Sequence, residues 1–383
     1  MTGEVLRVVS TEARVTWLAA AAERLLLETL DAREALSKST GLSVPMVEWG
    51  ARSTLHTIQP AALRALARQV EETGRYPISN LSIVLAGNLF TAAVRAVVVP
   101  LLLGIPVTVR ASSRETLFPR MLHDVLRSCD SELGAAMRLV AFSGGDLESE
   151  RSLFAESEAT AVYGSDDTIA AMIRRHPDAN LIAHGHGVSA AYCGPEALHG
   201  DRISKTIARL ALDVCAYDKR GCLSPQVVYV VADSETSASA FAERFATEGM
   251  DSLARELPRG PLAPEVGAAQ AQWRGVAEVE GALIVGDTYG IAIGTPATLR
   301  WSPGYRNVTI VPVHDRSEAL RALTPLGATL KCIGSDSASS SALRAELDRS
   351  ERLTAYVCPL GSMQTPGLDA PADGKPIWDG LLR

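Results

Sequence analysis

The sequence has 383 residues, of which 47% are hydrophobic, and a formal net charge of −7. A chain of this size can bury two or three domain cores. The acidic balance argues against a nucleic-acid-binding protein, which needs clustered basic residues. The six cysteines are scattered without a CxxC pair, so we expect reduced thiols, a cytoplasmic protein and no structural metal site.

The sequence offers no segment that would enter a membrane. Charged residues interrupt the first 24 positions, which therefore do not resemble a signal peptide. The most hydrophobic stretch, residues 96–109, contains Gly104 and Pro106 and is too short to span a bilayer. We interpret it as part of the core.

The first part of the chain is predicted to be helical, and alternation begins after it. Leucines at helical spacing predict a helix over 11–37, and an Ala-rich helix over 60–73 ends at Gly74. The strands predicted next are 82–86, 107–110, 138–142, 160–163 and 180–183, with intervening helices at 91–103, 114–128, 148–156 and 168–174. This alternation is typical of a parallel, doubly wound α/β sheet.

A second α/β unit is predicted to follow. Its first elements are a helix near 205–215, a strand at 227–231 and a helix at 237–247. Loops are predicted for the Pro-rich segment 256–266 and for the Ser-rich run 335–341, and an extended tail for 359–383. The domains expected are 1–212 for N-terminal helices and a cofactor-binding domain, 213–355 for a catalytic domain, and 356–383 for a C-terminal tail.

Cys222 lies in a segment that could activate a thiol. Gly221 lets a substrate approach the backbone, and the adjacent cations Lys219 and Arg220 could lower the thiol pKa. Backbone N–H groups near a helix N-terminus could also stabilise an oxyanion. A lone cysteine is more often a small buried hydrophobe, and we keep that interpretation for the other five. These are Cys129, Cys193, Cys215, Cys332 and Cys358.

Two further candidates lie where a predicted strand gives way to a helix. Asn88 could donate from its amide to a substrate carbonyl, or it could be an ordinary turn or cap residue. Gly164 and Ser165 begin a helix whose N-terminus could bind phosphate, although the two aspartates that follow favour a plain cap. No GxGxxG follows any predicted strand, so the ordinary dinucleotide fingerprint is lacking.

His184 and His186 follow another predicted strand. Either imidazole could transfer protons near neutral pH. One of them could equally be a structural histidine at a glycine-rich turn. The residues alone leave both interpretations open.

Taken together, these segments resemble the fatty acyl-CoA reductase family of bacterial bioluminescence, a branch of the aldehyde dehydrogenase superfamily. Residues 216–226 resemble its nucleophile segment, in which an aromatic residue and Asp precede the Cys and a Gln follows it. The likeness runs from about residue 76 to the C-terminus. It includes residues 87–90, 100–110, 164–165 and 378–380.

The resemblance implies an aldehyde dehydrogenase-like fold with a Rossmann-like cofactor domain and a catalytic domain. It places Asn88 at the oxyanion-hole Asn, and Gly164 and Ser165 at the cofactor-binding turn. Arg110 stands where the superfamily has a Lys against the adenosine ribose, so it could pair with a 2′-phosphate. The 96-residue interval from Asn88 to His184, and the 38 residues from there to the cysteine, are close to those of the superfamily.

The chain also departs from the superfamily. His184 or its neighbours replace the general-base Glu, which suits an acyl-Cys intermediate that meets hydride before water. The block whose Glu holds the nicotinamide ribose is not recognisable, and residues 302–306 stand near its place. The missing general-base Glu favours reduction over oxidation, while the unrecognised block leaves open altered cofactor binding or a degenerate enzyme.

The activity implied is NADPH-dependent reduction of an acyl-CoA, with a fatty acyl group favoured and NADH as a second possible donor. Cys222 would carry the acyl group, Asn88 and the Cys222 N–H would hold the oxyanion, and His184 or His186 would supply a proton. The expected partners are an acyl-CoA or acyl-carrier substrate, an acyl-activating enzyme and a second copy of the chain.

Four alternatives remain open at this point. They are an NAD(P)-dependent aldehyde dehydrogenase, an acyl-phosphate reductase, a cofactor-free Cys–His acyltransferase or hydrolase, and a non-catalytic subunit of an acyl-activating complex. The first needs a water-activating base, the second differs only in its acyl donor, the third is independent of NADPH, and the last is not acylated.

Overall fold

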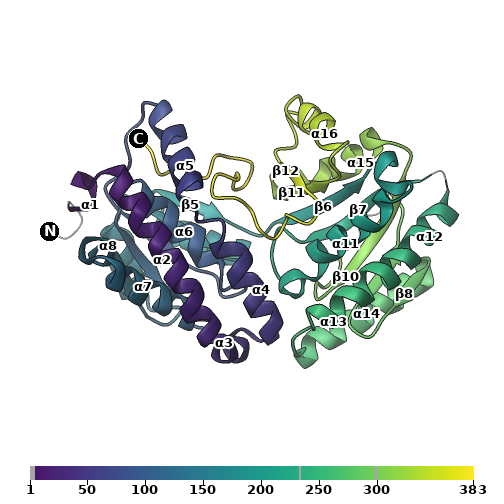
Figure 1. Ribbon diagram of the computed structural model, residues 1–383, viewed down its shortest axis with the longest axis horizontal. Helices are drawn as coiled ribbons and strands as arrows, with labels where there is room; N and C mark the ends of the chain where they lie inside the picture. The colour runs from purple at the N-terminus through teal and green to yellow at the C-terminus, as the bar shows by residue number, and fades with distance from the viewer. Residues whose placement is uncertain (1–4, 233, 298–300) are drawn as a thin grey trace. The chain divides into compact units, whose positions relative to one another are not determined.

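The computed structural model describes residues 5–232, 234–297 and 301–383 (Figure 1). These residues form two compact units. The first unit holds the described residues up to His186 together with Pro366–Arg383, and the second unit is Gly187–Thr365. The chain therefore leaves the first unit directly after His186 and returns to it near the C-terminus.

The first unit is built on a five-stranded parallel sheet in the order β3-β2-β1-β4-β5. Its strands are β1 (Leu81–Val84), β2 (Val107–Arg110), β3 (Met137–Val140), β4 (Ala159–Tyr163) and β5 (Leu181–His184). All four residues of β1 are buried, as expected for a strand covered on both faces. The strand order reverses at β1, and ligands of such sheets bind outside the carboxyl ends of the strands at this point.

Helices flank this sheet, and their positions agree with most of the predicted alternation. They are α1 (Val5–Val8), α2 (Thr11–Asp31), α3 (Arg33–Thr40), α4 (Val44–Leu55), α5 (Pro60–Glu72), α6 (Ala92–Leu102), α7 (Leu117–Cys129), α8 (Ser131–Ala135), α9 (Leu147–Ala155) and α10 (Asp166–Arg175). The helix predicted over 11–37 is two helices, α2 and α3, and α4 was not predicted. Helix α2 packs against α4, α5, α6 and α7 (Figure 1). Helices α9 and α10 pack against Val84 and Val162 of the sheet.

The second unit contains a seven-stranded sheet in the order β12-β11-β6-β7-β10-β9-β8. Its strands are β6 (Val188–Cys193), β7 (Pro225–Val231), β8 (Leu283–Val285), β9 (Gly290–Ile293), β10 (Asn307–Val313), β11 (Leu330–Ser335) and β12 (Tyr356–Pro359). All neighbours are parallel except β8, which is antiparallel to β9. Ala191 and Cys193 of β6 belong to one apolar core, while Ala190 and Tyr192 belong to another. Alternate residues thus face opposite sides of the sheet, and each side has its own apolar core. A sheet covered on both faces is the doubly wound arrangement that the sequence predicted.

The helices of the second unit cover both cores. They are α11 (Arg202–Cys215), α12 (Glu235–Arg244), α13 (Asp251–Glu256), α14 (Pro264–Glu280), α15 (Arg316–Leu323) and α16 (Ser340–Leu347), with short turns η1 (Pro195–Leu198), η2 (Ala216–Lys219), η3 (Phe245–Met250) and η4 (Thr324–Thr329). The predicted loop over 256–266 is shorter than expected, because Pro264 begins α14 at a position where proline loses no helical hydrogen bond. Among the helices that the structure describes, none is long and apolar enough to cross a membrane.

The observed units differ from the domain boundaries expected at residues 212 and 355. A boundary at 212 would cut α11 and separate β6 from β7 and β11, its hydrogen-bonded neighbours. A tail beginning at 356 would detach β12 from β11. Hydrophobic pattern predicts where strands lie but not with which sheet they pair. From Pro366 the chain has no further helix or strand, as expected of the tail.

Candidate active site

Most of the predicted site residues lie along one edge of the five-stranded sheet, which we call the carboxyl edge. Parallel strands end on the same side, so residues that follow different strands meet there. The candidates on this edge are Asn88 after β1, Arg110 at the end of β2, Gly164 and Ser165 after β4, and His184 at the end of β5. Backbone register places Arg110 opposite Val84, and His184 opposite Tyr163.

Asn88 is exposed on a bend between β1 and α6. The N-cap of α6 is Thr91, so Asn88 does not cap this helix. The preceding Gly87 allows a close approach of the next loop, since an added Cβ would lie 2.5 Å from Ser112 Oγ. The bend therefore presents an amide at the carboxyl edge.

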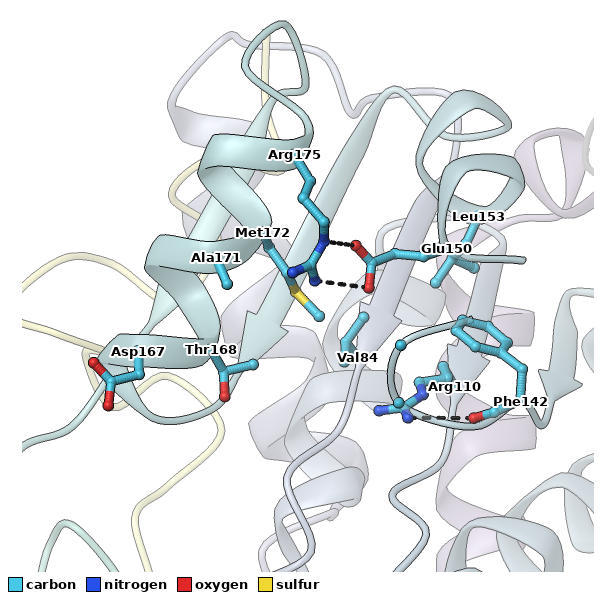
Figure 2. Close-up of a pocket in the computed structure, with 12 residues that line it drawn as sticks. Val84, Arg110, Phe142, Glu150, Leu153, Asp167, Thr168, Ala171, Met172 and Arg175 are labelled. Atoms are coloured by element: carbon cyan, nitrogen blue, oxygen red, sulfur yellow. Dashed lines mark hydrogen bonds and ion pairs between the residues drawn. The ribbon is translucent and has the colours of Figure 1, made fainter. Parts of the chain in front are cut away.

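Arg110 lines a pocket of about 350 Å³ beside the carboxyl edge. Figure 2 shows Arg110 and Phe142 on one side of this pocket and α10 with Met172 on the other. The Arg110 guanidinium lies 5.2 Å from the Phe142 ring centroid, and Nη2 donates to the Phe142 carbonyl at 3.3 Å. Arg110 Nε is buried and has no hydrogen-bond partner among the described residues. The pocket thus contains a cation with donor capacity to spare beside apolar walls.

A second charged group, the Glu150–Arg175 pair, lines the same pocket (Figure 2). Arg175 donates from Nε to Glu150 Oε1 at 2.6 Å and from Nη2 to Oε2 at 2.9 Å. His176 Nε2 lies 3.0 Å from Glu150 Oε1. Burial opposes ionisation, but the hydrogen bonds from Arg175 and His176 outweigh it and hold the pKa of Glu150 below its usual value. This arginine is therefore fixed by its carboxylate partner.

Ser165 is the N-cap of α10. Its Oγ accepts a hydrogen bond from the Thr168 backbone N–H at 3.3 Å and lies 2.9 Å from Thr168 Oγ1. Asp166 and Asp167 occupy the first turn, where carboxylates favourably oppose the helix dipole. The Ser165 side chain thus has the capping role that was the plainer of its two interpretations, and a contact with a cofactor stays a prediction.

The two histidine candidates have different surroundings. His184 Nδ1 lies 2.7 Å from Asp373 Oδ2, and its ring stacks on Tyr163 with a centroid separation of 4.4 Å. His186 is exposed, and its ring has no polar or aromatic partner in the described part of the chain. Its backbone N–H donates to Asp166 Oδ1 at 2.8 Å. His184 is therefore the better-positioned imidazole.

Cys222 lies in the second unit, on a segment that we call the Cys222 loop (residues 216–224). It is exposed, unlike the buried Cys193, Cys215, Cys332 and Cys358. Ser189 Oγ donates to the Cys222 carbonyl at 2.8 Å, which fixes the backbone of the loop. The element that follows is strand β7, in agreement with the strand predicted at 227–231, so no helix N-terminus supplies oxyanion donors directly after Cys222. Any oxyanion donor in this loop belongs to a turn.

A buried ion pair lies beneath the Cys222 loop. Tyr217, Asp218 and Lys219 all adopt the left-handed conformation, with φ of 52°, 53° and 57°. Such backbone is costly for side-chain-bearing residues and persists only where the surroundings fix it. Arg306 Nε donates to Asp218 Oδ1 at 3.0 Å, and the Gly260 N–H donates to Oδ2 at 3.0 Å. Both charged side chains of this pair are fully buried.

Lys219 and Arg220 are engaged away from the role that the sequence suggested. Lys219 Nζ donates to Ser302 Oγ at 2.7 Å and to the Asn307 carbonyl, and burial lowers the pKa of Lys219 well below its usual value. Arg220 lies 3.6 Å from Asp218 and over the Tyr305 ring. Lys219 Nζ therefore supports the base of the loop, and a direct effect of this side chain on the Cys222 thiol stays a prediction.

The sequence patterns did not identify three residues of these sites, namely Asp373, Ser302 and Arg306. Asp373 and Arg306 act on partners 189 and 88 residues away, so no local pattern indicates them. Ser302 and Arg306 lie in the segment that stands near the place of the missing Glu-containing block, and this was the one available signal. Within the described ranges, no cluster of His, Cys, Asp and Glu is arranged to hold a metal.

Comparison with known proteins shows the family of the chain. The family model described as acyl-CoA reductase (LuxC) matches residues 59–382, nearly the whole chain. The chain belongs to the acyl-CoA reductase (LuxC) family. It is therefore an enzyme, an oxidoreductase that converts an activated acyl group to an aldehyde. No curated protein matches the reductase in sequence.

Solved structures show the fold of the reductase. Aldehyde dehydrogenase 21 of Physcomitrella patens, in complex with the product succinate, aligns with a TM-score of 0.74 at 15% identity, over 100% of this chain and 86% of that chain. Glyceraldehyde-3-phosphate dehydrogenase of Methanocaldococcus jannaschii, complexed with NADP, gives 0.72 at 14% identity over 100% and 90%. An oxidoreductase of Marinobacter aquaeolei gives 0.74 at 13% identity over 100% and 87%. The predicted aldehyde dehydrogenase fold is confirmed.

Proposed function

We propose that this reductase converts an acyl-CoA thioester to an aldehyde through a covalent acyl intermediate on Cys222, with NADPH as the hydride donor. The observation that carries the proposal is the exposed Cys222 on a loop fixed from beneath by the buried Asp218–Arg306 ion pair and by the hydrogen bonds of Lys219. A fixed, accessible thiol is what nucleophilic attack on a thioester requires. The fully buried cysteines cannot meet a substrate.

The first step is thioester exchange at Cys222. The Cys222 thiolate attacks the acyl carbon, a new carbon–sulfur bond forms, and the bond to CoA breaks so that CoA leaves as a thiolate. The negative charge that develops on the carbonyl oxygen needs hydrogen-bond donors. We assign this role to the Asn88 amide, which is exposed and does not cap α6, and to the Cys222 backbone N–H.

The second half-reaction returns the enzyme to its free thiol. When bound, NADPH supplies the hydride that the acyl group receives. The resulting thiohemiacetal on Cys222 collapses to the aldehyde and the thiolate. His184 exchanges the proton that the substrate oxygen takes up and then loses, and we prefer it to His186 because its ring has fixed partners. By the family resemblance, His184 or its neighbours stand where the superfamily has its water-activating carboxylate, and this supports reduction over oxidation.

The pocket beside Arg110 fits the adenosine end of a nicotinamide cofactor. Its volume of about 350 Å³ and its apolar residues Leu153 and Met172 suit an adenine ring. Arg110 has a buried Nε without a partner, and a guanidinium is the side chain best suited to a phosphate. We therefore propose that Arg110 binds the 2′-phosphate, which favours NADPH over NADH. Gly164 and Ser165 would hold the cofactor at the start of α10.

We also propose a compartment, an oligomeric state and a source of the acyl donor for this enzyme. Six free thiols support a reducing compartment, and we propose the cytoplasm. Exposed apolar side chains on the second unit, Val279 of α14 and Val285 of the edge strand β8, support a homo-oligomer. The acyl donor would be an acyl-CoA or an acyl-carrier thioester, supplied by an acyl-activating enzyme.

The test combines catalysis with trapping of the intermediate. NADPH oxidation is followed with a series of acyl-CoAs and acyl phosphates, for the wild type, Cys222→Ala and Cys129→Ala. We expect Cys222→Ala to abolish aldehyde formation, because the proposal assigns the acyl group to this thiol alone. The melting temperature should not change. Cys129→Ala is the matched control, since Cys129 is the other cysteine that is not buried, and it should retain activity.

Radiolabelled acyl-CoA, without NADPH, should leave label on the wild type and on Cys129→Ala but not on Cys222→Ala. Activity in the Cys222 variant would contradict the covalent mechanism. If the wild type prefers acyl phosphates, the acyl donor is an acyl phosphate and not an acyl-CoA. A wild type that is neither labelled nor active would indicate a non-catalytic subunit.

A further inference from the structure

We propose that Asp373 is a positioning residue that holds His184 in a single tautomer, so that Nε2 is the ring atom that exchanges a proton with substrate. The inference rests on the proposed function, in which His184 is the proton donor. It adds a residue from the C-terminal tail, 189 positions away, to the machinery of the carboxyl edge.

The hydrogen bond between the two side chains determines which nitrogen carries the proton. Asp373 Oδ2 lies 2.7 Å from His184 Nδ1. A carboxylate can only accept, so Nδ1 must carry the proton and donate it. In the neutral ring the lone pair is then on Nε2, and in the charged ring Nε2–H is the proton that can leave. Nε2 has no partner among the residues that the structure describes.

Stacking fixes the plane of the same ring. Tyr163 and His184 are register partners on β4 and β5, and their rings lie 16° from parallel. Burial, aided by the Asp373 charge and partly opposed by Arg95, raises the pKa of Tyr163 to about 12. The phenol therefore stays neutral and does not compete with Asp373 for the imidazole proton. Two contacts leave the imidazole one orientation.

Asp373 is held on a tight turn of its own. The Ala372 N–H donates to the Lys375 carbonyl at 2.8 Å, and the Lys375 N–H donates back at 3.0 Å. Asp373 has φ of 54°, a left-handed conformation that Asp and Asn tolerate better than other side-chain-bearing residues. In the same stretch, the Ala370 carbonyl accepts a hydrogen bond from Arg95 of α6. The carboxylate is thus presented by a defined backbone.

The His184–Asp373 pair is not needed to attach the tail. Backbone hydrogen bonds join Tyr76 and Arg383 in both directions, at 3.1 and 2.8 Å, and Ile78 donates to the Leu381 carbonyl at 3.0 Å. Arg75 also donates to the Leu382 carbonyl. The side chains of His184 and Asp373 remain 19% and 26% exposed, so the pair is accessible. A purely structural attachment would not require this accessibility.

The decisive variant is Asp373→Asn, because Asn tolerates the same left-handed backbone and removes only the charge. An amide can either accept from Nδ1–H or donate to Nδ1, so it no longer selects the tautomer. We expect kcat to fall by about tenfold or more, with a much smaller change in KM. Asp369→Asn is the matched control, since Asp369 is exposed on the same tail and should leave kcat unchanged.

Two further measurements separate positioning from stability. Imidazole ¹⁵N chemical shifts, assigned by comparison with His184→Gln, should show a protonated Nδ1 in the wild type and mixed tautomers in Asp373→Asn. In the double variant, Asp373→Asn should cause no further loss of kcat beyond that of His184→Gln, because Asp373 acts through the imidazole. Melting temperatures of all variants report any merely structural effect.

Wild-type kcat and an unchanged His184 ¹⁵N spectrum in Asp373→Asn would overturn the inference, as would fully additive losses in the double variant. If the wild type reduces no acyl-CoA, the proposed function fails instead. The ¹⁵N measurement needs no activity and would still decide whether Asp373 sets the tautomer.

Discussion

The carboxyl edge of the five-stranded sheet and the Cys222 loop differ in where they keep their charged groups. On the carboxyl edge, charged and titratable side chains reach a pocket or solvent, as Arg110 and His184 do. In the Cys222 loop the charges lie beneath the backbone, and both Asp218 and Arg306 are fully buried. We therefore expect the first region to bind an anionic ligand and to move protons, and the second to hold the sulfur of Cys222 in place.

The difference also separates function from stability. A ligand-facing cation must leave donor capacity unused, and Arg110 does so at Nε. A buried cation must have its partners, since an uncompensated charge in the interior costs several kcal/mol. Substitutions on the carboxyl edge should therefore change binding and rate, while substitutions under the Cys222 loop should first change folding.

The largest effect is expected for Asp218→Asn. Asn keeps the left-handed backbone but leaves the Arg306 guanidinium buried without a counter-charge, so the free energy of unfolding should fall by about 3–5 kcal/mol. Urea denaturation measures this loss, and the rate of Cys222 alkylation reports the state of the loop. The control is Asp287→Asn, an exposed acid of the same unit. A change below about 0.5 kcal/mol, the ordinary range of surface substitutions, would contradict the assigned role of the ion pair.

Arg110→Ala should have the next largest effect, on cofactor binding and not on folding. A charge-assisted hydrogen bond contributes about 1.5–3 kcal/mol, so the Kd for NADPH should rise by about ten- to a hundredfold while that for NADH changes little. Titration calorimetry with both cofactors measures the difference, and Arg120→Ala on the exposed side of α7 is the control. An equal loss for both cofactors would show that Arg110 does not read the 2′-phosphate.

The smallest effect, expressed per pH unit, concerns the pH dependence of stability under the Cys222 loop. Burial lowers the pKa of Lys219 well below that of a lysine in the unfolded chain, which titrates near pH 10.4. Between these two pKa values the unfolded state binds more protons, so stability should rise with pH by at most about 1.4 kcal/mol per pH unit. Lys219→Met should remove this rise, and the exposed Lys205→Met should keep it. Urea denaturation between pH 7 and 9.5 measures the slopes, and identical slopes in all three proteins would contradict the burial argument.

The sequence by itself determined the alternation of strands and helices and the residues that end the strands. Short-range periodicity records burial, which is why β2 was predicted at its observed bounds and why Arg110 and His184 could be assigned to strand ends. Family resemblance then singled out Cys222 and the acyl-CoA reductase activity. The family match confirms the activity and does not test Cys222. The roles of the individual residues stay predictions.

Only the tertiary structure decided which side chains meet. It showed that β6 belongs to the second sheet, that Lys219 supports the Cys222 loop from beneath, and that Asp373 contacts the ring of His184. Strand pairing and buried ion pairs depend on packing between segments far apart in the chain. A local pattern carries no record of a partner 88 or 189 residues away. For this reason only the folded chain revealed the contact of Asp373 with His184 and that of Arg306 with Asp218 of the Cys222 loop.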